Sequence, residues 1–290
     1  MGSSMDPSPR VPVPPVVMPA ASPAGQGLAI DTSRPHEARR YDYWLGGKDN
    51  FAVDRASGDA IAAAFPTIRC AAVENRRFVL RVVETLAEAG VRQWLDIGTG
   101  IPTSPAVHEV AQAVDPGCRV VYVDKDPMVV VHAAAMMNSS PCGATAYVQA
   151  DLRDPQKILA HPAVVATLDF GQPIALLLGA VLHFLADSDD PYRIVAHLAQ
   201  ALPPGSYLVL SHATLDLPPA ETVERLSAVI ATGEHGTLRP RTRNEIARFL
   251  TGMELLEPGL VPVVQWRPDR PPSPEASAEE TALYGVVART

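Results

Sequence analysis

The chain has few cysteines: Cys70, Cys118 and Cys142 are the only three among 290 residues, and they lie far apart. They show neither the paired spacing of a zinc site nor the density of a disulfide framework. This pattern indicates small buried thiols in a reducing, cytoplasmic environment. No apolar run approaches the ~20 residues of a membrane span, and the N-terminus lacks the charged-then-apolar pattern of a signal peptide. We therefore expect neither a membrane protein nor a secreted one.

Positive charge is also scarce. The chain carries 24 lysine and arginine residues against 32 aspartate and glutamate residues, for a formal net charge of -8, and it has no local basic run. Because nucleic-acid binding draws much of its affinity from cationic contacts with phosphates, a nucleic-acid partner is not expected. The sequence also shows no cluster of metal-ligand residues. We expect a globular protein with a small-molecule substrate and no metal.

Apolar residues are abundant enough for one large domain. The chain is 47% hydrophobic, and at this length folding buries ~75% of the surface of the unfolded chain. Residues 1–30, rich in Pro, Ala and Ser, are expected to form a disordered tail. Residues 31–90 predict a helical region and residues 91–290 an α/β core, with a surface loop rich in Pro, Ser and Glu at 267–280.

The helical region predicts three helices, and the third carries an apolar stripe whose only polar member is Asn75. A buried amide without a hydrogen bond costs ~1–3 kcal/mol. Asn75 therefore either bonds to a neighbouring backbone group or faces a ligand crevice. The three helices are expected from a cap at Thr32 or Ser33 to Gly46, from 51 to 65, and from 67 to 89.

Strands and helices alternate from residue 91 onward. Short apolar strands separated by helices predict a mostly parallel, seven-stranded sheet with helices on both faces. The last two strands flank the surface loop, so we expect them to pair as an antiparallel hairpin at the sheet edge. The predicted strands are 93–97, 119–123, 145–149, 174–178, 207–211, 260–265 and 283–288. The predicted helices are 106–114, 127–138, 155–160, 191–202, 219–232 and 241–251.

The segment WLDIGTGIPT, residues 94–103, predicts the first strand, turn and helix start of a nucleotide-type fold, whose ligand lies at the carboxyl ends of the strands. Asp96 would repel the pyrophosphate of a dinucleotide and attract the sulfonium and ammonium groups of S-adenosylmethionine. Thr103 replaces the third glycine of the dinucleotide motif and is expected near a helix N-terminus. The turn residues predicted to bind the cofactor are Asp96, Gly98, Thr99 and Gly100.

The ends of the next strands supply further candidates. Asp124 lies 124 − 100 = 24 residues after Gly100, close to the ~20 expected of an acid that accepts from ribose hydroxyls. Asp126 is interpreted as the cap of the following helix. Asp151 is predicted to accept from the adenine amine or to cap a helix. The other predicted cofactor-binding residues are Lys125, Leu152 against the adenine ring, and Gly179 and Ala180 beside the sulfonium.

Two parts of the sequence supply candidates for residues that contact a second substrate beside S-adenosylmethionine. His183, after the fourth strand, is predicted as a general base or, alternatively, as a histidine satisfied at a helix start; His212 is a weaker candidate. In the N-terminal segment ARRYDYWLGGKDNF, Tyr41 and Tyr43 stand in a cluster of aromatic residues. Because aromatic faces attract cations, we predict that this segment forms a lid over a sulfonium ligand. Asn75, like Tyr41 and Tyr43, is predicted to contact the substrate or to belong to this lid.

Five segments, RRYDYWLGGKDNF, ENRRFV, LDIGTGIPT, VVYVDKDP and ALLLGAVLHFL, follow one another in the chain. In this order they resemble an actinobacterial-type family of S-adenosylmethionine-dependent methyltransferases, long catalogued as a domain of unknown function. The resemblance covers residues 31–290 and implies a class I methyltransferase fold, Rossmann-like with an antiparallel last strand. Two positions depart from the general class I pattern, Pro102 and Gly179. The resemblance assigns cofactor roles to Asp96, Gly98, Gly100, Asp124 and Asp151.

Together these observations predict methyl transfer from S-adenosylmethionine to an O, N or S atom of a small molecule. Two alternatives stay open at this point. One is a non-catalytic protein that binds S-adenosylmethionine in a regulatory role. The other is an NAD-dependent oxidoreductase on the same architecture.

Overall fold

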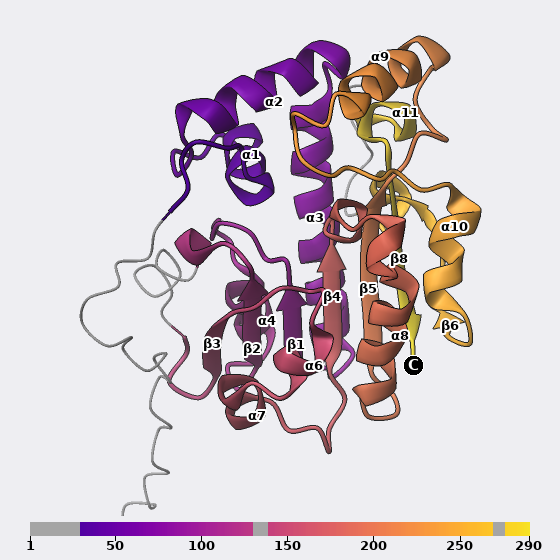
Figure 1. Ribbon diagram of the computed structural model, residues 1–290. Helices are drawn as coiled ribbons and strands as arrows, with labels where there is room; N and C mark the ends of the chain where they lie inside the picture. Colours follow the sequence, from indigo (N-terminus) through magenta and orange to yellow (C-terminus); the bar gives the residue numbers. More distant parts are fainter. Residues whose placement is uncertain (1–29, 130–138, 269–275) are drawn as a thin grey trace, which may run out of the picture.

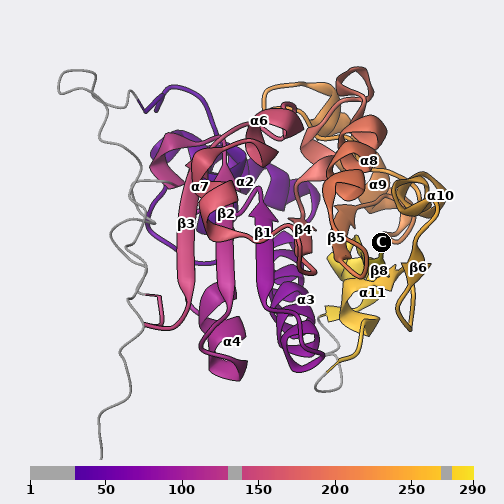
Figure 2. The ribbon, with the colours of Figure 1, turned by 90° about the horizontal axis from the view of Figure 1, so that it is seen from below.

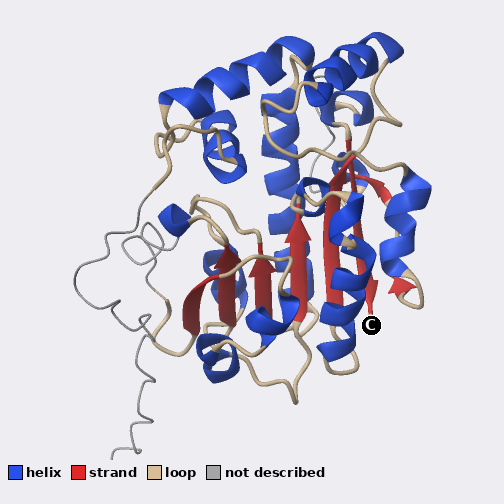
Figure 3. Ribbon diagram, in the orientation of Figure 1, coloured by secondary structure: helices blue, strands red, loops and turns tan. Residues whose placement is uncertain are grey.

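The computed structural model describes residues 30–129, 139–268 and 276–290. Their eight strands form one sheet in the order β3-β2-β1-β4-β5-β8-β6, and β7 pairs with β8 (Figures 1 and 3). The first five strands are parallel, whereas β8 runs antiparallel to β5, β6 and β7. The strands are β1 Gln93–Ile97, β2 Arg119–Asp124, β3 Ala144–Gln149, β4 Ala175–Gly179, β5 Tyr207–Ala213, β6 Glu254–Leu255, β7 Val261–Pro262 and β8 Leu283–Arg289.

Helices cover both faces of this sheet and the edge where the parallel strands end. Figure 2 shows α3 (Ile68–Glu88) and α4 (Val107–Val114) on one face, and α6 (Pro155–Leu159), α7 (Pro162–Thr167) and α8 (Pro191–Ala201) on the other. The N-terminal helices α1 (Glu37–Trp44) and α2 (Ala52–Ala64) lie beyond the carboxyl ends of the parallel strands (Figure 1). Helix α9 (Ala220–Ala231) packs against α2. The remaining helices are α10 Arg243–Ala247, α11 Ala278–Thr281 and the 3₁₀ turns η1 Leu182–Phe184, η2 Asp187–Asp189, η3 Arg248–Leu250 and η4 Val263–Gln265.

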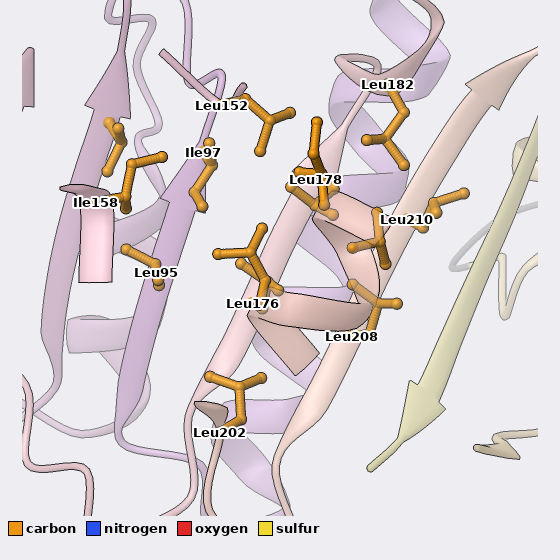
Figure 4. Packing of buried hydrophobic residues seen from close by; sticks show 14 of the residues in the cluster. Leu95, Ile97, Leu152, Ile158, Leu176, Leu178, Leu182, Leu202, Leu208 and Leu210 are labelled. Carbon is orange, nitrogen blue, oxygen red and sulfur yellow. The ribbon is translucent and has the colours of Figure 1, made fainter. Parts of the chain in front are cut away.

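The two faces of the sheet hold two separate apolar cores. Because side chains alternate along a strand, Leu95 and Ile97 of β1 point into one core with leucines of β4 and β5 (Figure 4). Trp94 points into the other core, which α3 and α4 cover. Each fully buried leucine contributes about 1.5–3 kcal/mol. The same alternation places Asp96 on the α3 side, just where the strand ends.

The five parallel strands and the helices between them confirm the predicted architecture, with boundaries shifted by one or two residues. Helix α7 was not predicted. The helix expected at 127–138 begins at Pro127, but residues 130–138 lie outside the described part of the chain. The tail expected at 1–30 also lies outside it, apart from residue 30.

The predicted antiparallel pairing of the last two strands is confirmed, since β7 pairs with β8, but the predicted place at the sheet edge is wrong. Strand β8 lies inside the sheet, between β5 and β6, and six of its seven residues are buried. The segment 260–265 contributes only the short strand β7 and then turns into η4. Pro262 in β7 lacks the N–H that would continue a ladder. With β6 added, the sheet has eight strands rather than seven among the described residues.

Three further boundaries differ from prediction. Helix α1 is capped by His36, whose side chain accepts from the Ala38 N–H, and not by Thr32 or Ser33. The helix expected at 241–251 is shorter, because Thr242 caps it and its last turn is the 3₁₀ turn η3. The loop expected at 267–280 includes the start of α11, where Ser277 and Glu280 form a capping box; residues 269–275 lie outside the described chain. Among the helices that the structure describes, none has the length and hydropathy to span a membrane.

Candidate active site

A cleft of ≈ 120 Å³ opens at the carboxyl ends of β1, β2, β3 and β4, below α1. The sheet supplies its floor, and α1 and α3 supply its other walls. The strand-end residues that the sequence predicted meet here, although they are spread over more than 80 positions of the chain. The predicted residues that line the cleft are Tyr41, Asn75, Asp96, Gly98, Thr99, Gly100, Asp124, Lys125, Asp151, Leu152, Gly179 and Ala180.

The turn after β1 requires glycine. Gly98 has a φ of +77°, and a Cβ there would lie 2.3 Å from a methyl of Val181. The Gly100 N–H donates to Oδ2 of Asp124 at 2.9 Å, which ties the turn to the end of β2. The helix predicted at 106–114 begins at Val107, so Thr103 precedes it and does not lie at the helix N-terminus as expected. The positive end of a helix dipole is therefore not adjacent to this turn.

Asp96 is a buried carboxyl that lines the cleft, with 8% of its surface exposed. Burial raises its pKa to about 6 despite the nearby Arg76 cation and a hydrogen bond from Thr99, and the Asp124 carboxylate raises it slightly further. An acid held in this state gains from a cationic ligand, which would favour its ionised form. Asp96 is thus suited to an ammonium or sulfonium group.

Arg76 is a cleft residue that the sequence analysis missed. It lies next to Asn75 on α3, and its guanidinium donates to the carbonyls of Thr103 at 2.9 Å and Pro105 at 2.5 Å. Its Nε is buried and has no partner in the described part of the chain. Arg76 beside Asp96 places a cation next to an acid, which matches the carboxylate and ammonium of an amino acid. The signal was present in ENRRFV, but Arg76 falls outside the apolar stripe that drew attention to Asn75.

Asp124 stands at the end of β2 with both carboxylate oxygens held by backbone. Oδ2 accepts from Gly100 N and Oδ1 from Asp126 N, each at 2.9 Å. Burial raises its pKa, while these hydrogen bonds and His36 oppose that rise. Two oxygens offer about four lone-pair positions, so two remain for hydroxyl donors such as a ribose diol. Asp126 caps the next helix by accepting from Met128 N, as predicted.

The ends of β3 and β4 line the opposite wall. Asp151 accepts from the Arg153 N–H at 2.9 Å and pairs with the Arg153 guanidinium, and Leu152 is buried beside it. At the end of β4, Gly179 has Val79 at 3.1 Å from the position of a Cβ, so a larger side chain would crowd the cleft. Lys125 lies on the α1 side, where its Nζ is 3.4 Å from the Glu37 carboxylate.

A chain of hydrogen bonds crosses the floor between the sheet and α1. Ala180 N donates to Ser211 Oγ at 2.9 Å, and that hydroxyl donates to Asn75 Oδ1 at 2.6 Å. Asn75 Nδ2 donates to the Tyr41 hydroxyl at 3.0 Å, which in turn donates to the Ala72 carbonyl at 2.8 Å. Asn75 therefore does both things considered for it: it is hydrogen-bonded internally, through side chains, and it lines the cleft.

The two predicted histidines, His183 and His212, do not line the cleft. His183 instead lines a second, adjoining cavity. Its Nδ1 accepts from Ala213 N at 3.2 Å, so its proton resides on Nε2, and burial holds its pKa well below 6.5. His212 bonds through both ring nitrogens, to the Ala213 carbonyl and to Arg241, and burial lowers its pKa to about 3.

Tyr43 lines neither cavity. Its hydroxyl donates to Asp59 at 2.8 Å, and its ring lies under the Arg69 guanidinium at 4.4 Å. It connects α1 to α2 and α3 on the side away from the cleft. Within the described ranges, no group of three or more His, Cys, Asp or Glu side chains could hold a metal ion.

The chemistry of the cleft fits S-adenosylmethionine group by group. Asp96 and Arg76 supply an acid and a cation suited to an ammonium and a carboxylate, Asp124 has acceptors suited to a ribose diol, and Leu152 with Asp151 provides an apolar surface beside an acceptor. A parallel, doubly covered sheet with acids at the ends of adjacent strands, at its topological switch point, defines a class I, Rossmann-like methyltransferase.

Comparison with known proteins identifies the group within that class. The S-adenosyl methyltransferase family matches residues 23–290. A DUF574 family protein from Streptomyces avermitilis is 45% identical, with a TM-score of 0.85 over 90% of this chain and 100% of that one. A candidate methyltransferase from Thermobifida fusca is 42% identical, with a TM-score of 0.82 over 90% of this chain and 96% of that one. Among curated proteins, none matches.

The chain belongs to the S-adenosyl methyltransferase family. The resemblance inferred from its sequence motifs is confirmed, and the protein is an S-adenosylmethionine-dependent methyltransferase. The regulatory and oxidoreductase alternatives are not retained.

Proposed function

We propose that the protein binds S-adenosylmethionine in the cleft at the carboxyl ends of β1 to β4 and transfers its methyl group to an O, N or S atom of a small molecule. The observation that carries this proposal is the pairing of buried Asp96 with Asp124 across the Gly98–Gly100 turn. Asp96 suits the cationic methionine end, and Asp124 suits the ribose. A pyrophosphate would meet two acids at the same place.

The remaining cleft residues position the ligand. Arg76 lines the cleft and its Nε has no partner among the described residues, so we assign it to the methionine carboxylate. Asp151 and Leu152 receive the adenine, and Gly179 and Ala180 leave room beside the sulfur. Lys125 closes the α1 side through its contact with Glu37.

Positioning supplies most of the catalysis in this proposal. S-adenosylmethionine carries a methyl group that is already activated on a sulfonium, so alignment of donor and acceptor and exclusion of water lower the barrier. The geometry favours a different role for His183 from the predicted general base. With Nδ1 engaged by Ala213 N and its pKa lowered, His183 presents an N–H donor to the adjoining cavity, where it can orient an acceptor oxygen.

Replacement of Asp124 tests the donor site. Asp124→Ala removes the acceptors for the ribose diol, each worth about 1.5–3 kcal/mol when the acceptor is charged. We expect calorimetric titration with S-adenosylhomocysteine to show affinity lowered by ten-fold or more. The matched control is Asp115→Ala, since Asp115 follows α4, lies outside the cleft and pairs with Arg92 at the surface. Equal affinities of wild type and Asp124→Ala would remove Asp124 from the site.

A further inference from the structure

A second cavity, of ≈ 110 Å³, adjoins the cleft. This is many times the ~10–15 Å³ that one water molecule occupies on such a measure. Its walls come from α1, α2, α3, α9 and η1, from the segment that follows β5, and from the junction of α11 and β8. Five residues line both spaces and form the neck between them: Glu37, Tyr41, Asn75, Ala180 and Phe184.

The walls of the second cavity are predominantly aliphatic and aromatic. Trp44 and Phe65 bring aromatic surface from α1 and from the end of α2, and leucine and isoleucine side chains face them from α3 and α9. A ligand that fills this space gains ~25 cal/mol for each Å² of apolar surface removed from water. The cavity therefore selects for an apolar body. The leucine and isoleucine residues lining it are Ile61, Ile68, Leu215, Leu226, Ile230, Leu238 and Leu283.

The polar groups of the walls are largely engaged with one another. Tyr41 and Asn75 belong to the hydrogen-bond chain that ends on the Ala72 carbonyl. The Glu37 carboxylate faces Lys125 at 3.4 Å. A charged ligand would have to leave water without gaining a new partner among these groups, which is costly.

The exceptions are the His183 N–H and Arg40. Arg40 is 2% exposed, and its Nη1 donates to Ser57 Oγ at 3.1 Å and to the His235 carbonyl at 2.9 Å, while its Nε has no partner in the part of the chain that the structure describes. The carboxylates of Glu37 and Asp54 already act on its charge. What Arg40 lacks is thus a hydrogen-bond acceptor and not a counter-ion, and a neutral carbonyl or hydroxyl oxygen meets that need.

We propose that this second cavity is the methyl-acceptor site and that it takes an uncharged, largely apolar ring compound. The compound would carry an oxygen for Arg40 and a hydroxyl or amine group that reaches the neck beside Tyr41 and Ala180. This rests on the proposed binding of the methyl donor in the cleft. In the step, the acceptor lone pair forms a bond to the methyl carbon, the carbon–sulfur bond breaks with its electrons left on sulfur, and the acceptor proton leaves to water.

Two naphthalene probes of nearly equal size test the charge preference. One is 6-hydroxy-2-acetonaphthone, which is neutral, and the other is 6-hydroxy-2-naphthoate, which carries a carboxylate in place of the ketone. Binding is followed by probe fluorescence in protein saturated with S-adenosylhomocysteine. We expect saturable binding of the ketone at least ten-fold tighter than binding of the carboxylate. Stronger or equal binding of the carboxylate, or no saturable binding of the ketone, would overturn the proposal.

Two variants on α9 locate the bound probe. Ile230→Trp fills the second cavity and should weaken ketone binding ten-fold or more, whereas Ala228→Trp places the same side chain at an exposed position outside both cavities. Unchanged ketone binding in Ile230→Trp would also contradict the proposal. Calorimetric titration with S-adenosylhomocysteine is run on each protein. If it shows no binding to wild type, the donor assignment fails; if donor binding is intact and the ketone result fails, only the acceptor assignment falls.

Discussion

Two aspartates on adjacent strands receive very different surroundings. Asp96 sits where desolvation dominates and raises its pKa to about 6. Asp124 is also desolvated, but two backbone N–H groups bond to its oxygens. One acid is thus prepared to gain from a cation, and the other to share its lone pairs with hydroxyls. The division of roles follows from which neighbours each strand end meets.

The first prediction concerns Asp96→Asn. Because the pKa of Asp96 is raised, its contribution to the free energy of unfolding is fully present below pH 3.8, the ordinary pKa. That contribution is lost as the pH rises through about 6. At pH 8 the ionised carboxyl therefore destabilises the free protein, by up to ~3 kcal/mol at 1.36 kcal/mol per pKa unit. We expect Asp96→Asn to raise the free energy of unfolding at pH 8, to leave it unchanged near pH 3.5, and to weaken S-adenosylhomocysteine binding. A less stable variant at pH 8 would contradict the assigned burial cost.

The same pKa predicts how wild-type affinity depends on pH. A ligand ammonium favours ionised Asp96, so protonation of this acid competes with binding. The dissociation constant for S-adenosylhomocysteine should be flat above pH 7 and rise towards ten-fold per pH unit below about 6. Titrations from pH 5 to pH 8 measure this, and Asp96→Asn should flatten the profile. A wild-type profile that stays flat over this pH range would show that Asp96 does not bind the ligand ammonium.

Residue positions were predictable where a strand end dictates them. Asp96, Asp124 and Asp151 each follow an apolar run, and parallel strands bring such positions to one edge. Arg76 was missed because its role depends on how α3 is rotated against the sheet. His183 was predicted from the sequence to face the methyl acceptor; it follows the turn at Ala180, which has a φ of +53°, and lines the adjoining cavity rather than the cleft.

At the scale of elements, helix α1 is attached to the core by buried charge. Arg39 Nε lies 3.5 Å from Asp54 Oδ1 and 3.8 Å from Asp126 Oδ2. Asp54 also accepts from the backbone N–H groups of His36 and Phe51, each at 2.8 Å. These contacts place α1 over the cleft, so the ligand site depends on them.

A pair of aspartate variants on α2 tests this attachment. Asp54 is 0% exposed, and Asp54→Ala leaves Arg39 buried without this partner, which costs about 3–5 kcal/mol. Asp59→Ala removes an exposed partner of Arg69 and should cost about 0–1 kcal/mol. Denaturant unfolding measures both, and hydrogen exchange should show faster exchange in α1 for Asp54→Ala alone. Similar effects of the two variants would refute a special role for the buried cluster.

Helices and strands were predictable in the regular core and less so at the ends. Alternating apolar strands and amphipathic helices identify β1 to β5 and the helices between them. The start of α1 was misplaced because His36 is an uncommon cap, and its side chain was not considered as one. The short strands β6 and β7 hold two residues each, too few for any periodicity to show.

For the whole molecule, the position of β8 decides how the sheet is completed. It pairs with β5 along its full length and with β6 and β7 on its other side. Its pairing with the 260–265 segment was predicted from the sequence. Its position between β5 and β6 was not, because pairing over such distances along the chain is set by tertiary packing. The run from Leu283 to Ala288 is buried throughout, as an internal strand requires.

Removal of β8 should therefore unfold the protein. A chain that ends at Ala282 exposes the β5 edge and both apolar cores, and we expect it to lose cooperative thermal unfolding. A chain that lacks only Thr290 loses two contacts to the Ser206 carbonyl, at 3.0 and 3.4 Å, and should unfold within a few degrees of the full protein. Circular dichroism during heating separates the two. A cooperative transition in the chain that ends at Ala282 would show that β8 is dispensable.

Binding of the donor product to the wild-type protein tests the central claim most directly. Calorimetric titration at pH 8 with S-adenosylhomocysteine, and in parallel with NADH, compares an ammonium-bearing ligand with a pyrophosphate at the same acids. We predict saturable binding of one S-adenosylhomocysteine per chain and no detectable binding of NADH. Tight NADH binding with no S-adenosylhomocysteine signal would contradict the role assigned to Asp96 and Asp124.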